Sequence, residues 1–487
     1  MAVLNEILKN CKPKTVIGNA ECEISELAFD SRKVKKGAVF FAIRGTNLDG
    51  HDYVQAAVAQ GAVALVLEEI PTKQYPSVTY VQVDDSAQAL AFAASAFYGN
   101  PSSRLKLVGI TGTNGKTTTA TLLYRLFKNL GYKVGLISTV ENRIDEQRIS
   151  TRHTTPDVVR TNSLLKKMID AGCSHCFMEV SSHAIVQQRI SGLEFAGAIF
   201  TNITHEHLDY HHSFDKYIKA KKAFFDILPK EAFALVNNDD KNGQIMLQNC
   251  KARKYTFGLK GFMDFKCKII ESHFNGMQLD IDKHEVWSLL IGRFNAYNLL
   301  AVYACALLLS EDKFEVLQKL TLEKPVRGRF EPLYSEEGIT AIIDYAHTPD
   351  ALENVLQTIN NIRSGAENLI SLVGAGGDRD KSKRPLMAKI AAQYADKVIL
   401  TSDNPRSEKP EAIIDDMKTG IDKAAQRKTL SIVDRREAIK TAIMLAKHGD
   451  IILIPGKGHE EYQEINGVRY DFNDKKIVSE LLTIQNL

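Results

Sequence analysis

The chain lacks the features that mark a secreted or membrane protein. Its seven cysteines are odd in number and scattered, which does not fit a disulfide framework. Cys173 and Cys176 form a lone C-x-x-C pair beside His175, which we interpret as two buried thiols rather than a redox or metal site. No charged and then apolar leader opens the chain, and no apolar run reaches the length of a membrane span. These absences predict a cytoplasmic protein without a membrane partner.

The chain also lacks an excess of charge of either sign. It has 62 Lys and Arg against 59 Asp and Glu, and its net charge is +3. A dedicated nucleic-acid-binding protein would carry a basic face, so we expect no nucleic-acid partner. The near balance still leaves room for local basic pockets that hold small anionic substrates.

A length of 487 residues is too great for one hydrophobic core and predicts about three domains. Turn-forming residues near position 100 and a second boundary near Arg329 divide the chain. The predicted domains are 1–100, 101–329 and 330–487.

Apolar runs typical of strands alternate with helical patterns in the second and third domains, and the first domain has similar short runs. This alternation predicts βαβ units and mostly parallel sheets, so the fold class is α/β. Ligands of such sheets lie beyond the carboxyl ends of the strands. The predicted strands are Ala38–Ile43, Ala62–Leu67, Leu105–Thr111, Val134–Ser138, Cys176–Val180, Ala196–Thr201, Ala232–Val236, Thr340–Asp344, Leu369–Val373, Lys397–Thr401 and Ile451–Ile454.

The segment from Val108 to Thr118 reads as a strand, a glycine-rich turn and the start of a helix. Main-chain N–H groups and the positive helix end would face an anion there. Lys116 adds a charge, and the Thr117 hydroxyl can bind Mg²⁺. The usual first glycine of a phosphate loop falls at Ile110, whereas Gly109 lies one place early. The predicted phosphate-binding residues are Gly112, Thr113, Asn114, Gly115, Lys116, Thr117 and Thr118.

Glu179 ends an apolar strand and would point toward the same phosphate site. Because Mg²⁺ prefers oxygen ligands, we interpret Glu179 as a magnesium ligand. The alternative is an acid near the N-cap of the following helix.

Histidines cluster after the predicted strand Ala196–Thr201, at His205, His207, His211 and His212. Imidazole suits zinc, but no cysteine lies close and the H-E-x-x-H pattern is absent. One imidazole in a magnesium shell is the preferred interpretation. A zinc site and a solvated polar loop stay open as alternatives.

The segment 213–228 predicts a helix with Ser213 as its N-cap. Its lysines could form a solvated basic face. Helical spacing nevertheless places Lys221 on the face of Tyr217 and Phe224, so we expect that this lysine is not simply exposed.

Arg327 and Arg329 lie at the second domain boundary, where they could clamp phosphates or form interdomain salt bridges. Loops after three predicted strands of the third domain combine arginine, carboxylate and amide groups, which could hold a zwitterion or form ordinary turns. These loops contain Gly374–Lys381, Asp403–Arg406 and Gly456–Glu460.

Taken together, these motifs resemble the Mur ligase family, which adds amino acids to the peptidoglycan precursor. The resemblance covers the whole chain and favours the branch that adds the third residue to UDP-N-acetylmuramoyl-L-alanyl-D-glutamate. It implies an N-terminal α/β UDP-binding domain, a central P-loop parallel-sheet ATPase domain and a C-terminal Rossmann-like α/β domain. The motifs are Asp30-Ser31-Arg32, T-G-T-N-G-K-T at 111–117, Thr154-Thr155-Pro156, E-V-S-S-H at 179–183, Asn202 with His207-Leu208-Asp209, Tyr217 with Ala220-Lys221, Gly328-Arg329 and D-Y-A-H at 344–347.

The resemblance implies an ATP-dependent amide ligation through an acyl phosphate, with catalytic Lys116, Lys221 and His207. ATP would also contact Asn295, Arg329, Asp344 and His347, and Mg²⁺ would bind Thr117, Glu179, His207 and Lys221. Lys221 matches the lysine that becomes an N-carboxylated carbamate in this family. The UDP-sugar dipeptide would contact Ser31, Thr154, Thr155, Ser181, Gln187 and Arg189.

The Asp403–Arg406 segment resembles members that add meso-diaminopimelate, because Arg406 would grip the distal carboxylate that lysine lacks. The alternatives are ligation of L-lysine or another diamino acid, a folylpolyglutamate-synthase-like ligase, or a nucleotide-dependent switch. We expect a monomer. The implied diaminopimelate contacts are Arg379, Asp403, Asn404, Pro405, Arg406, Gly456 and Glu460.

Overall fold

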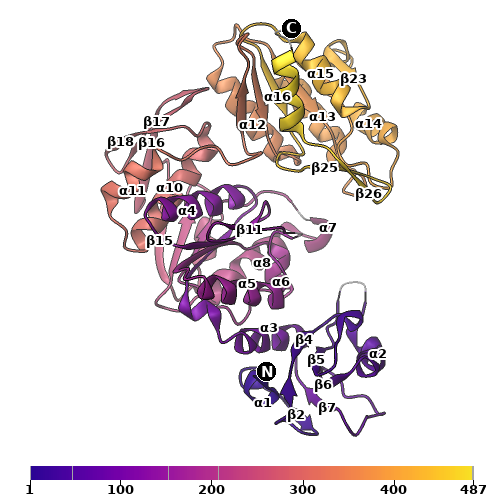
Figure 1. Cartoon of the computed structure of the whole chain (residues 1–487). Helices are drawn as coiled ribbons and strands as arrows, with labels where there is room; N and C mark the ends of the chain where they lie inside the picture. The colour runs from indigo at the N-terminus through magenta and orange to yellow at the C-terminus, as the bar shows by residue number, and fades with distance from the viewer. Residues whose placement is uncertain (1, 46–47, 152, 207, 485–487) are drawn as a thin grey trace. The chain divides into compact units, whose positions relative to one another are not determined.

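The computed structural model describes residues 2–45, 48–151, 153–206 and 208–484 (Figure 1). The described residues fall into two compact units that cut across the predicted domains. The turn of the predicted phosphate loop belongs to the same unit as the C-terminal third of the chain. The first unit comprises Met1–Gly112, Thr119–Thr201 and Asp215–Thr256, and the second comprises Thr113–Thr118, Asn202–Phe214 and Phe257–Leu487.

The first unit begins with a sheet of strand order β2-β7-β6-β5-β4, in which β2 (Thr15–Ile17) is antiparallel and the other pairs are parallel. Val39 and Phe41 pack in one cluster with α1 and α3, whereas Phe40 packs with α2 in another. Alternate side chains of β5 therefore enter opposite cores. The other elements are α1 (Leu4–Leu8), β4 (Glu26–Ala28), β5 (Ala38–Phe41), α2 (Val54–Ala59), β6 (Ala62–Leu67), β7 (Thr79–Gln82) and α3 (Ser86–Phe97).

The second sheet of this unit runs β11-β10-β9-β12-β8-β13-β14, with a parallel ladder from β9 to β14. Glu179, the last residue of β12, pairs in register with Ile110 of β8. The carboxylate of Glu179 is therefore carried on the strand beside the one that leads into the phosphate loop. The elements are β8 (Lys106–Thr111), β9 (Val134–Ile137), β10 (Asn142–Ile144), β11 (Gln147–Ile149), α5 (Val158–Asp170), β12 (His175–Glu179), β13 (Gly197–Phe200), α8 (Phe214–Asp226) and β14 (Phe233–Asn237).

Gly109 serves packing rather than the phosphate loop. It lies inside β8, and a Cβ atom there would stand 2.4 Å from the Phe224 ring of α8. Phe224 is fully buried, so α8 can approach β8 this closely only because position 109 carries no side chain.

The second unit contains an antiparallel meander that the sequence patterns did not predict. It consists of β16 (Phe265–His273), β17 (Gly276–Ile281) and β18 (His284–Ser288), and Phe257 at the end of β15 (Arg253–Gly258) pairs with Phe265. The helix α10 (Arg293–Leu308) packs against β16, and α11 (Lys313–Leu320) packs against β18.

The C-terminal sheet has the strand order β19-β20-β24-β21-β22-β23, in which β19 is antiparallel. Helices α12, α13 and α14 share one core with Ile342, and α15 and α16 share another with Ile343. Insertion of β24 between β20 and β21 makes a topological switch point, where open α/β sheets bind ligands. The elements are β19 (Glu331–Tyr334), β20 (Thr340–Ile343), α12 (Pro349–Ile362), β21 (Leu369–Val373), α13 (Lys383–Tyr394), β22 (Lys397–Leu400), α14 (Pro410–Lys418), β23 (Thr429–Ser431), α15 (Arg435–Leu445), β24 (Ile451–Ile454), β25 (Tyr462–Ile465), β26 (Val468–Asp471) and α16 (Asp474–Ile484).

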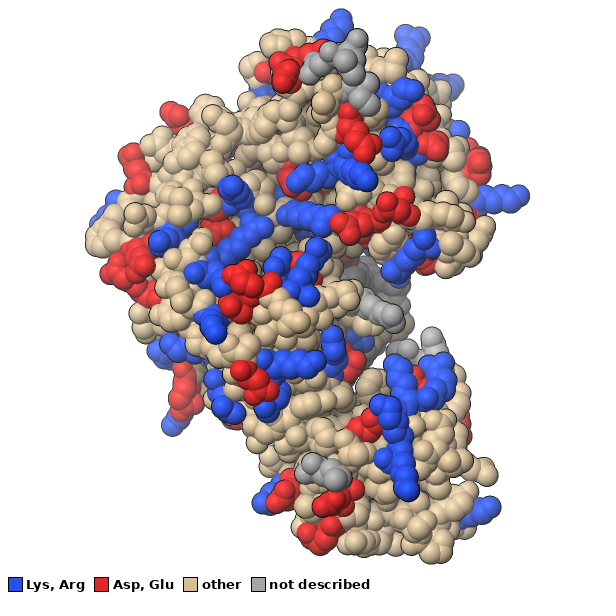
Figure 2. All heavy atoms as spheres, in the orientation of Figure 1, with Lys and Arg blue, Asp and Glu red and all other residues tan. Residues whose placement is uncertain are grey.

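The predicted α/β fold class is confirmed, and the predicted strands recur within two residues at each end. The structure does not test the predicted domain boundaries. Among the described helices, none combines the length and the apolar character that crossing a membrane would need. On the face in Figure 2, basic side chains are interspersed with acidic ones over both the N-terminal and the C-terminal parts.

Gly109→Ala should lower the free energy of unfolding by about 1–3 kcal/mol, because the new methyl group overpacks a filled core. Urea unfolding measures this loss. The double variant Gly109→Ala/Phe224→Leu should lose less than the sum of the two single variants, since the smaller side chain makes room. An unchanged free energy of unfolding in Gly109→Ala would contradict this packing role.

Candidate active site

The predicted phosphate loop has the backbone that an anion cradle needs. β8 ends directly before Gly112, and α4 (Lys116–Asn129) begins at Lys116. Gly112 and Gly115 adopt φ angles of 151° and 88°, a region that favours glycine. The main chain therefore turns sharply between strand and helix, so that its N–H groups gather at the positive end of α4.

Asn202 braces this turn. Its main-chain carbonyl accepts a hydrogen bond from the N–H of Thr113 at 2.8 Å, and its Oδ1 accepts from the N–H of Asn114 at 2.9 Å. Its Nδ2 donates to the carbonyl of Asn114 at 3.1 Å. One side chain thereby bonds both main-chain polar groups of Asn114, which fixes the turn without a ligand.

Lys116, Thr117 and Arg329 come together at the turn. Lys116 Nζ donates to the carbonyl of Thr113 at 2.7 Å, and Arg329 Nη2 donates to Thr117 Oγ1 at 3.3 Å. The Arg329 guanidinium also lies over the Tyr345 ring, 4.2 Å from its centroid. Two roles were considered for the boundary arginines, and Arg329 fits that of a phosphate contact. The planar N–H donors of its guanidinium suit phosphate oxygens.

Arg327 follows the other interpretation and forms an ion pair with Glu461. Asp344 supports the Arg329 segment, because its Oδ2 accepts from the N–H of Phe330 at 2.6 Å and its Oδ1 accepts from the N–H of Ala346 at 2.7 Å. Burial raises the pKa of the Asp344 carboxyl.

The two remaining predicted nucleotide contacts, His347 and Asn295, take no part in these hydrogen bonds, although the His347 ring lies 4.6 Å from the Tyr345 ring between their centroids. His347 is exposed, and its Nδ1 lies 2.7 Å from the carbonyl of Tyr345. Asn295 is buried in α10, where its Nδ2 donates to the carbonyl of Ile291 at 2.8 Å. Within the described chain, no hydrogen bond joins Asn295 to the turn.

Glu179 is a fully buried carboxylate at the end of β12. Its Oε1 accepts from the N–H of Thr139 at 2.7 Å and its Oε2 accepts from Thr139 Oγ1 at 3.1 Å. No Lys, Arg or His among the described residues forms an ion pair with it. A buried carboxylate in this state can gain stability from a cation, so the residue fits the predicted metal role.

Thr155 joins Glu179 to the predicted dipeptide contacts. Its Oγ1 donates to the main-chain carbonyl of Glu179 at 2.8 Å and accepts from the N–H of Ser181 at 3.1 Å. Arg189 Nη1 donates to the carbonyl of Thr155 at 2.9 Å, and its Nη2 donates to Gln187 Oε1 at 2.6 Å. These bonds preorganise a polar surface next to the strand end.

Thr154 belongs to the same group, since its Oγ1 lies 3.0 Å from Thr139 Oγ1. Ser31 lies elsewhere in the first unit, at the start of a 3-10 turn that spans Ser31–Lys33, and is buried. Asp30 caps this turn and pairs with Arg32 at 2.9 Å. In the described part of the chain, Ser31 shares no hydrogen bond with the Thr154 group.

Lys221 is buried on α8, as predicted, with 1% of its surface exposed. Its Nζ donates to the carbonyl of Gly112 at 2.7 Å and lies 4.6 Å from the centroid of the Tyr217 ring. The neighbouring Lys222 instead pairs with Asp226 at 2.5 Å. The structure thus places the amine of Lys221 at the first residue of the phosphate turn.

His207 lies outside the described residues, so its predicted metal role is not tested. His205 stacks on Phe214 at 4.3 Å between ring centroids. Among the described residues, no group of three or more His, Cys, Asp or Glu has the arrangement of a metal site. The interpretation of Cys173 and Cys176 as buried thiols is confirmed, and burial raises the pKa of both.

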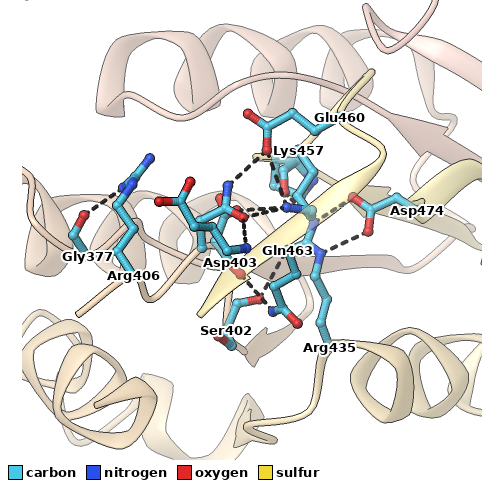
Figure 3. Close-up of polar contacts among 12 residues, drawn as sticks. Gly377, Ser402, Asp403, Arg406, Arg435, Lys457, Glu460, Gln463 and Asp474 are labelled. Carbon is cyan, nitrogen blue, oxygen red and sulfur yellow. Dashed lines mark hydrogen bonds and ion pairs between the residues drawn. The ribbon is translucent and has the colours of Figure 1, made fainter. Parts of the chain in front are cut away.

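Loops from three neighbouring strands of the C-terminal sheet meet beyond their carboxyl ends (Figure 3). Arg406, after β22, donates from Nη1 to the carbonyl of Gly377, after β21, at 2.6 Å. Asn404 donates from Nδ2 to Oε2 of Glu460, after β24, at 2.9 Å. The structure therefore brings residues of all three predicted amino-acid-binding loops together at the switch point.

The same loops fit closely through their backbones. A Cβ atom on Gly377 would lie 1.9 Å from the carbonyl oxygen of Pro405, and one on Gly456 would lie 2.8 Å from Asp403 Oδ2. Arg379 is exposed and forms no hydrogen bond or ion pair with any described residue.

The site contains residues that the sequence analysis did not assign. Lys457 is fully buried among the C-terminal loops, and Arg435 is fully buried beneath them. Lys457 stands in the conspicuous Gly456–Glu460 motif, which was a usable signal. Arg435 follows Asp434 at the start of a helix and resembles an ordinary exposed helix residue, so nothing in the pattern marks it.

Asn202→Ala should weaken ATP binding about tenfold, because the turn loses two hydrogen bonds of Asn114. The measurement is the KM for ATP, with the KM values of the other substrates as internal controls. An unchanged KM for ATP would show that Asn202 does not shape the nucleotide site.

Models of Mur ligase domains match the chain in three places. The one described as Mur ligase family, catalytic domain matches residues 23–98, the Mur ligase middle domain matches residues 110–306, and the Mur ligase glutamate ligase domain matches residues 328–458. Folylpolyglutamate synthase from Thermotoga maritima shares the fold alone, at 16% identity and a TM-score of 0.59 over 81% of this chain and 93% of its own.

Curated relatives named UDP-N-acetylmuramoyl-L-alanyl-D-glutamate–2,6-diaminopimelate ligase match nearly the full chain. The protein from Cytophaga hutchinsonii is 56% identical over 469 residues, which is 96% of each chain, and that from Bacteroides fragilis is 55% identical over 481 residues, which is 99% of each. A solved structure of the same name is 31% identical with a TM-score of 0.71 and covers 100% of this chain and 99% of its own. The matched domain models and these relatives show that the chain belongs to the Mur ligase family.

Proposed function

We propose that the chain is an ATP-dependent ligase of the MurE type. It adds meso-2,6-diaminopimelate to the γ-carboxylate of D-glutamate in UDP-N-acetylmuramoyl-L-alanyl-D-glutamate, a step of peptidoglycan precursor synthesis. The observation that carries the proposal is the match of 55–56% identity, over almost the whole length, to ligases named for this reaction. Within this proposal the domains are 1–100, 101–329 and 330–487, and the protein acts as a cytoplasmic monomer.

The chemistry begins with a carboxylate that is a poor electrophile, because its negative charge shields the carbonyl carbon. Attack of a γ-carboxylate oxygen on the γ-phosphorus of ATP forms an acyl phosphate and releases ADP. The amine of diaminopimelate then attacks the acyl carbon, and phosphate leaves with the former carboxylate oxygen. An amide bond replaces the acyl–oxygen bond, and the amine loses a proton.

The braced turn supports the first step. The N–H groups of Gly112–Thr118 and the ammonium of Lys116 bind the phosphates, and Arg329 adds a planar donor beside Thr117. Asp344 holds the Arg329 segment in place through its bonds to Phe330 and Ala346. We also assign Asn295 and His347 to the nucleotide, on the pattern of the family.

Magnesium fits the donor set of this chain. Glu179 is a buried carboxylate without a cationic partner in the described chain, and Thr117 offers a hydroxyl. The family pattern adds His207 and a carboxylated Lys221. When bound, Mg²⁺ would neutralise charge on the phosphoryl group in transfer.

Lys221 supports the carbamate assignment through its burial and its place. A protonated amine cannot bind a metal, whereas loss of one proton and attack of the neutral amine on CO₂ gives an anionic carbamate, with release of two protons in all. The amine lies 2.7 Å from the carbonyl of Gly112, at the entrance to the phosphate turn. We assign Thr154, Thr155, Ser181, Gln187, Arg189 and Ser31 to the UDP-sugar dipeptide.

The C-terminal loops support the second step. Arg406 lies beside Gly377 with further guanidinium N–H groups that can grip a carboxylate. Glu460 offers a carboxylate for an ammonium, and Asp403, Asn404, Pro405, Gly456 and Arg379 complete the proposed contacts. This combination suits the distal end of meso-diaminopimelate, which carries both charges, better than lysine, which carries an ammonium alone.

An assay of ADP and phosphate release tests the function directly. Release should require UDP-N-acetylmuramoyl-L-alanyl-D-glutamate together with diaminopimelate, with one phosphate per amide formed. L-lysine should support a much lower kcat/KM. Equal use of L-lysine, use of a folate acceptor, or steady hydrolysis without any amine would each refute the proposal.

Lys221→Ala should lose at least about 100-fold in kcat, because the anionic oxygen donor disappears. Small carboxylates such as formate or acetate should restore part of the activity by supplying oxygens at the vacated place. The matched control is Lys222→Ala, which removes a surface ion pair on the same helix and should stay near wild type. Full activity of Lys221→Ala would exclude the carbamate role.

Arg406→Ala should raise the KM for diaminopimelate about 10- to 100-fold while the KM for ATP changes less than about twofold. Arg406→Lys keeps the charge but loses the planar pair of donors. Its KM for diaminopimelate should therefore lie between those of wild type and Arg406→Ala. Equal changes in both KM values would count against Arg406 as an amino-acid contact.

A further inference from the structure

Lys457 is a cation without exposure to solvent at the centre of the C-terminal loops. Its Nζ lies 3.0 Å from Asn404 Oδ1, 3.3 Å from Glu460 Oε2 and 3.6 Å from Asp403 Oδ1. The ring of Tyr462 lies 5.6 Å away. An ammonium in such a place needs polar partners, and here they are residues of the proposed amino-acid site. Figure 3 shows Lys457 between the Asp403 and Glu460 loops.

The bond from Lys457 fixes which way the Asn404 amide points. Asn404 Oδ1 accepts from Lys457 Nζ and from the N–H of Glu464, both at 3.0 Å. Both partners are donors alone, so the oxygen of the amide must face them and the nitrogen must face away. Asn404 Nδ2 uses one N–H for Glu460 Oε2, and no described residue accepts the other.

The same ammonium orients Glu460. Oε2 of Glu460 accepts from Lys457 and Asn404, whereas no described residue donates to Oε1. Lys457 therefore leaves one N–H of Asn404 and one oxygen of Glu460 without a partner among the described residues. A ligand that bears a carboxylate and an ammonium on one carbon would match that pair.

A second buried cation, Arg435, contacts the first residues of the loops that carry Glu460 and Asn404. Arg435 pairs with Asp474 through two hydrogen bonds of 2.9 and 2.8 Å, and both side chains are fully buried. Its Nη2 donates to the carbonyl of Pro455 at 2.9 Å, and its Nη1 lies 3.5 Å from the carbonyl of Ser402. These carbonyls directly precede Gly456 and Asp403, so the loops leave the sheet from fixed points.

The charges of this group are complementary to a zwitterion. Asp403 and Glu460 carry two negative charges against the one positive charge of Lys457, and Arg406 adds a positive charge at the rim. The carboxylate side of a ligand would be drawn to Arg406 and the Asn404 N–H, and its ammonium to Glu460 Oε1.

We propose that Lys457 is a positioning residue that sets the specificity of the amino-acid site: it presents Asn404 as a hydrogen-bond donor to a carboxylate and Glu460 as an acceptor for an adjacent ammonium. The inference rests on the proposed function and extends it to selection of an α-amino-acid centre at the end of the substrate remote from the reacting amine.

A role confined to core packing makes different predictions. If Lys457 only filled space and neutralised buried acids, its loss would lower stability and would affect all substrates alike. If Lys457 orients Asn404 and Glu460, its loss raises the KM for diaminopimelate and leaves the KM values of the other substrates nearly unchanged.

The first experiment compares wild type with Lys457→Met, a side chain of similar length without donor or charge. The KM for diaminopimelate should rise at least about tenfold, while the KM values for ATP and the UDP-dipeptide stay within about twofold. Unchanged ATP binding establishes that the variant is folded.

Asn404→Asp provides the second measurement, which keeps Lys457 and its charge. The new carboxylate keeps an oxygen acceptor for Lys457 and for the N–H of Glu464, but both N–H donors of the amide are lost. The KM for diaminopimelate should therefore rise about tenfold, while the KM for ATP stays within about twofold. This variant decides the question if Lys457→Met does not fold.

An unchanged KM for diaminopimelate in folded Lys457→Met, or in Asn404→Asp, overturns the inference. So does a uniform rise of the KM values for all three substrates. Wild-type protein that releases phosphate without need of diaminopimelate would instead refute the proposed function itself.

Discussion

The C-terminal end of this molecule depends on the burial of one ammonium, that of Lys457, among the side chains that solvate it. A charge removed from water must be surrounded by fixed dipoles and counter-charges, so its neighbours lose their freedom to rotate. Asn404 and Glu460 are held in this way, each by a bond of 3.0–3.3 Å. Rigidity at the surface of the site is thus a consequence of electrostatics beneath it.

The same logic appears in the first unit. Glu179 is buried at a strand end with main-chain and hydroxyl donors but no cation in the described chain, and Lys221 is buried with its amine on a main-chain carbonyl. Neither arrangement maximises the free energy of unfolding, because burial of an ionisable group opposes its charged form. Both are understandable if the residues serve a phosphoryl transfer that needs a metal and anionic oxygens.

Much of the fold could be predicted from the sequence, because buried parallel strands are continuous apolar runs such as Leu369–Val373. The phosphate turn could also be predicted, because Gly112 and Gly115 stand where the backbone adopts positive φ angles that favour glycine. The meander from β16 to β18 escaped because its strands are half exposed and carry mixed polarity. Gly109 lies near the phosphate-loop motif in the sequence but is not part of its function. It is needed for the close contact of β8 with Phe224, which is far away in the sequence.

Site residues could be predicted where polar side chains directly follow predicted strands. They could not be predicted where their role depends on tertiary contacts. Arg406 and Glu460 belong to recognisable loops, and the structure joins those loops. The orientation of Asn404 could not be predicted from the sequence, because the direction of an amide group is set by its hydrogen-bond partners in the folded structure. Arg435 and Asp474 lie far apart in sequence, and no local pattern reveals that they pair.

The central claim is that ATP activates the sugar-linked acid before the incoming amine reacts. It can be tested by placing ¹⁸O in the γ-carboxylate of the UDP-dipeptide and analysing the phosphate released during ligation. Because the carboxylate oxygen attacks phosphorus and later departs with it, each phosphate should carry one ¹⁸O per amide formed. Phosphate free of ¹⁸O, formed at the same rate as product, would contradict the account.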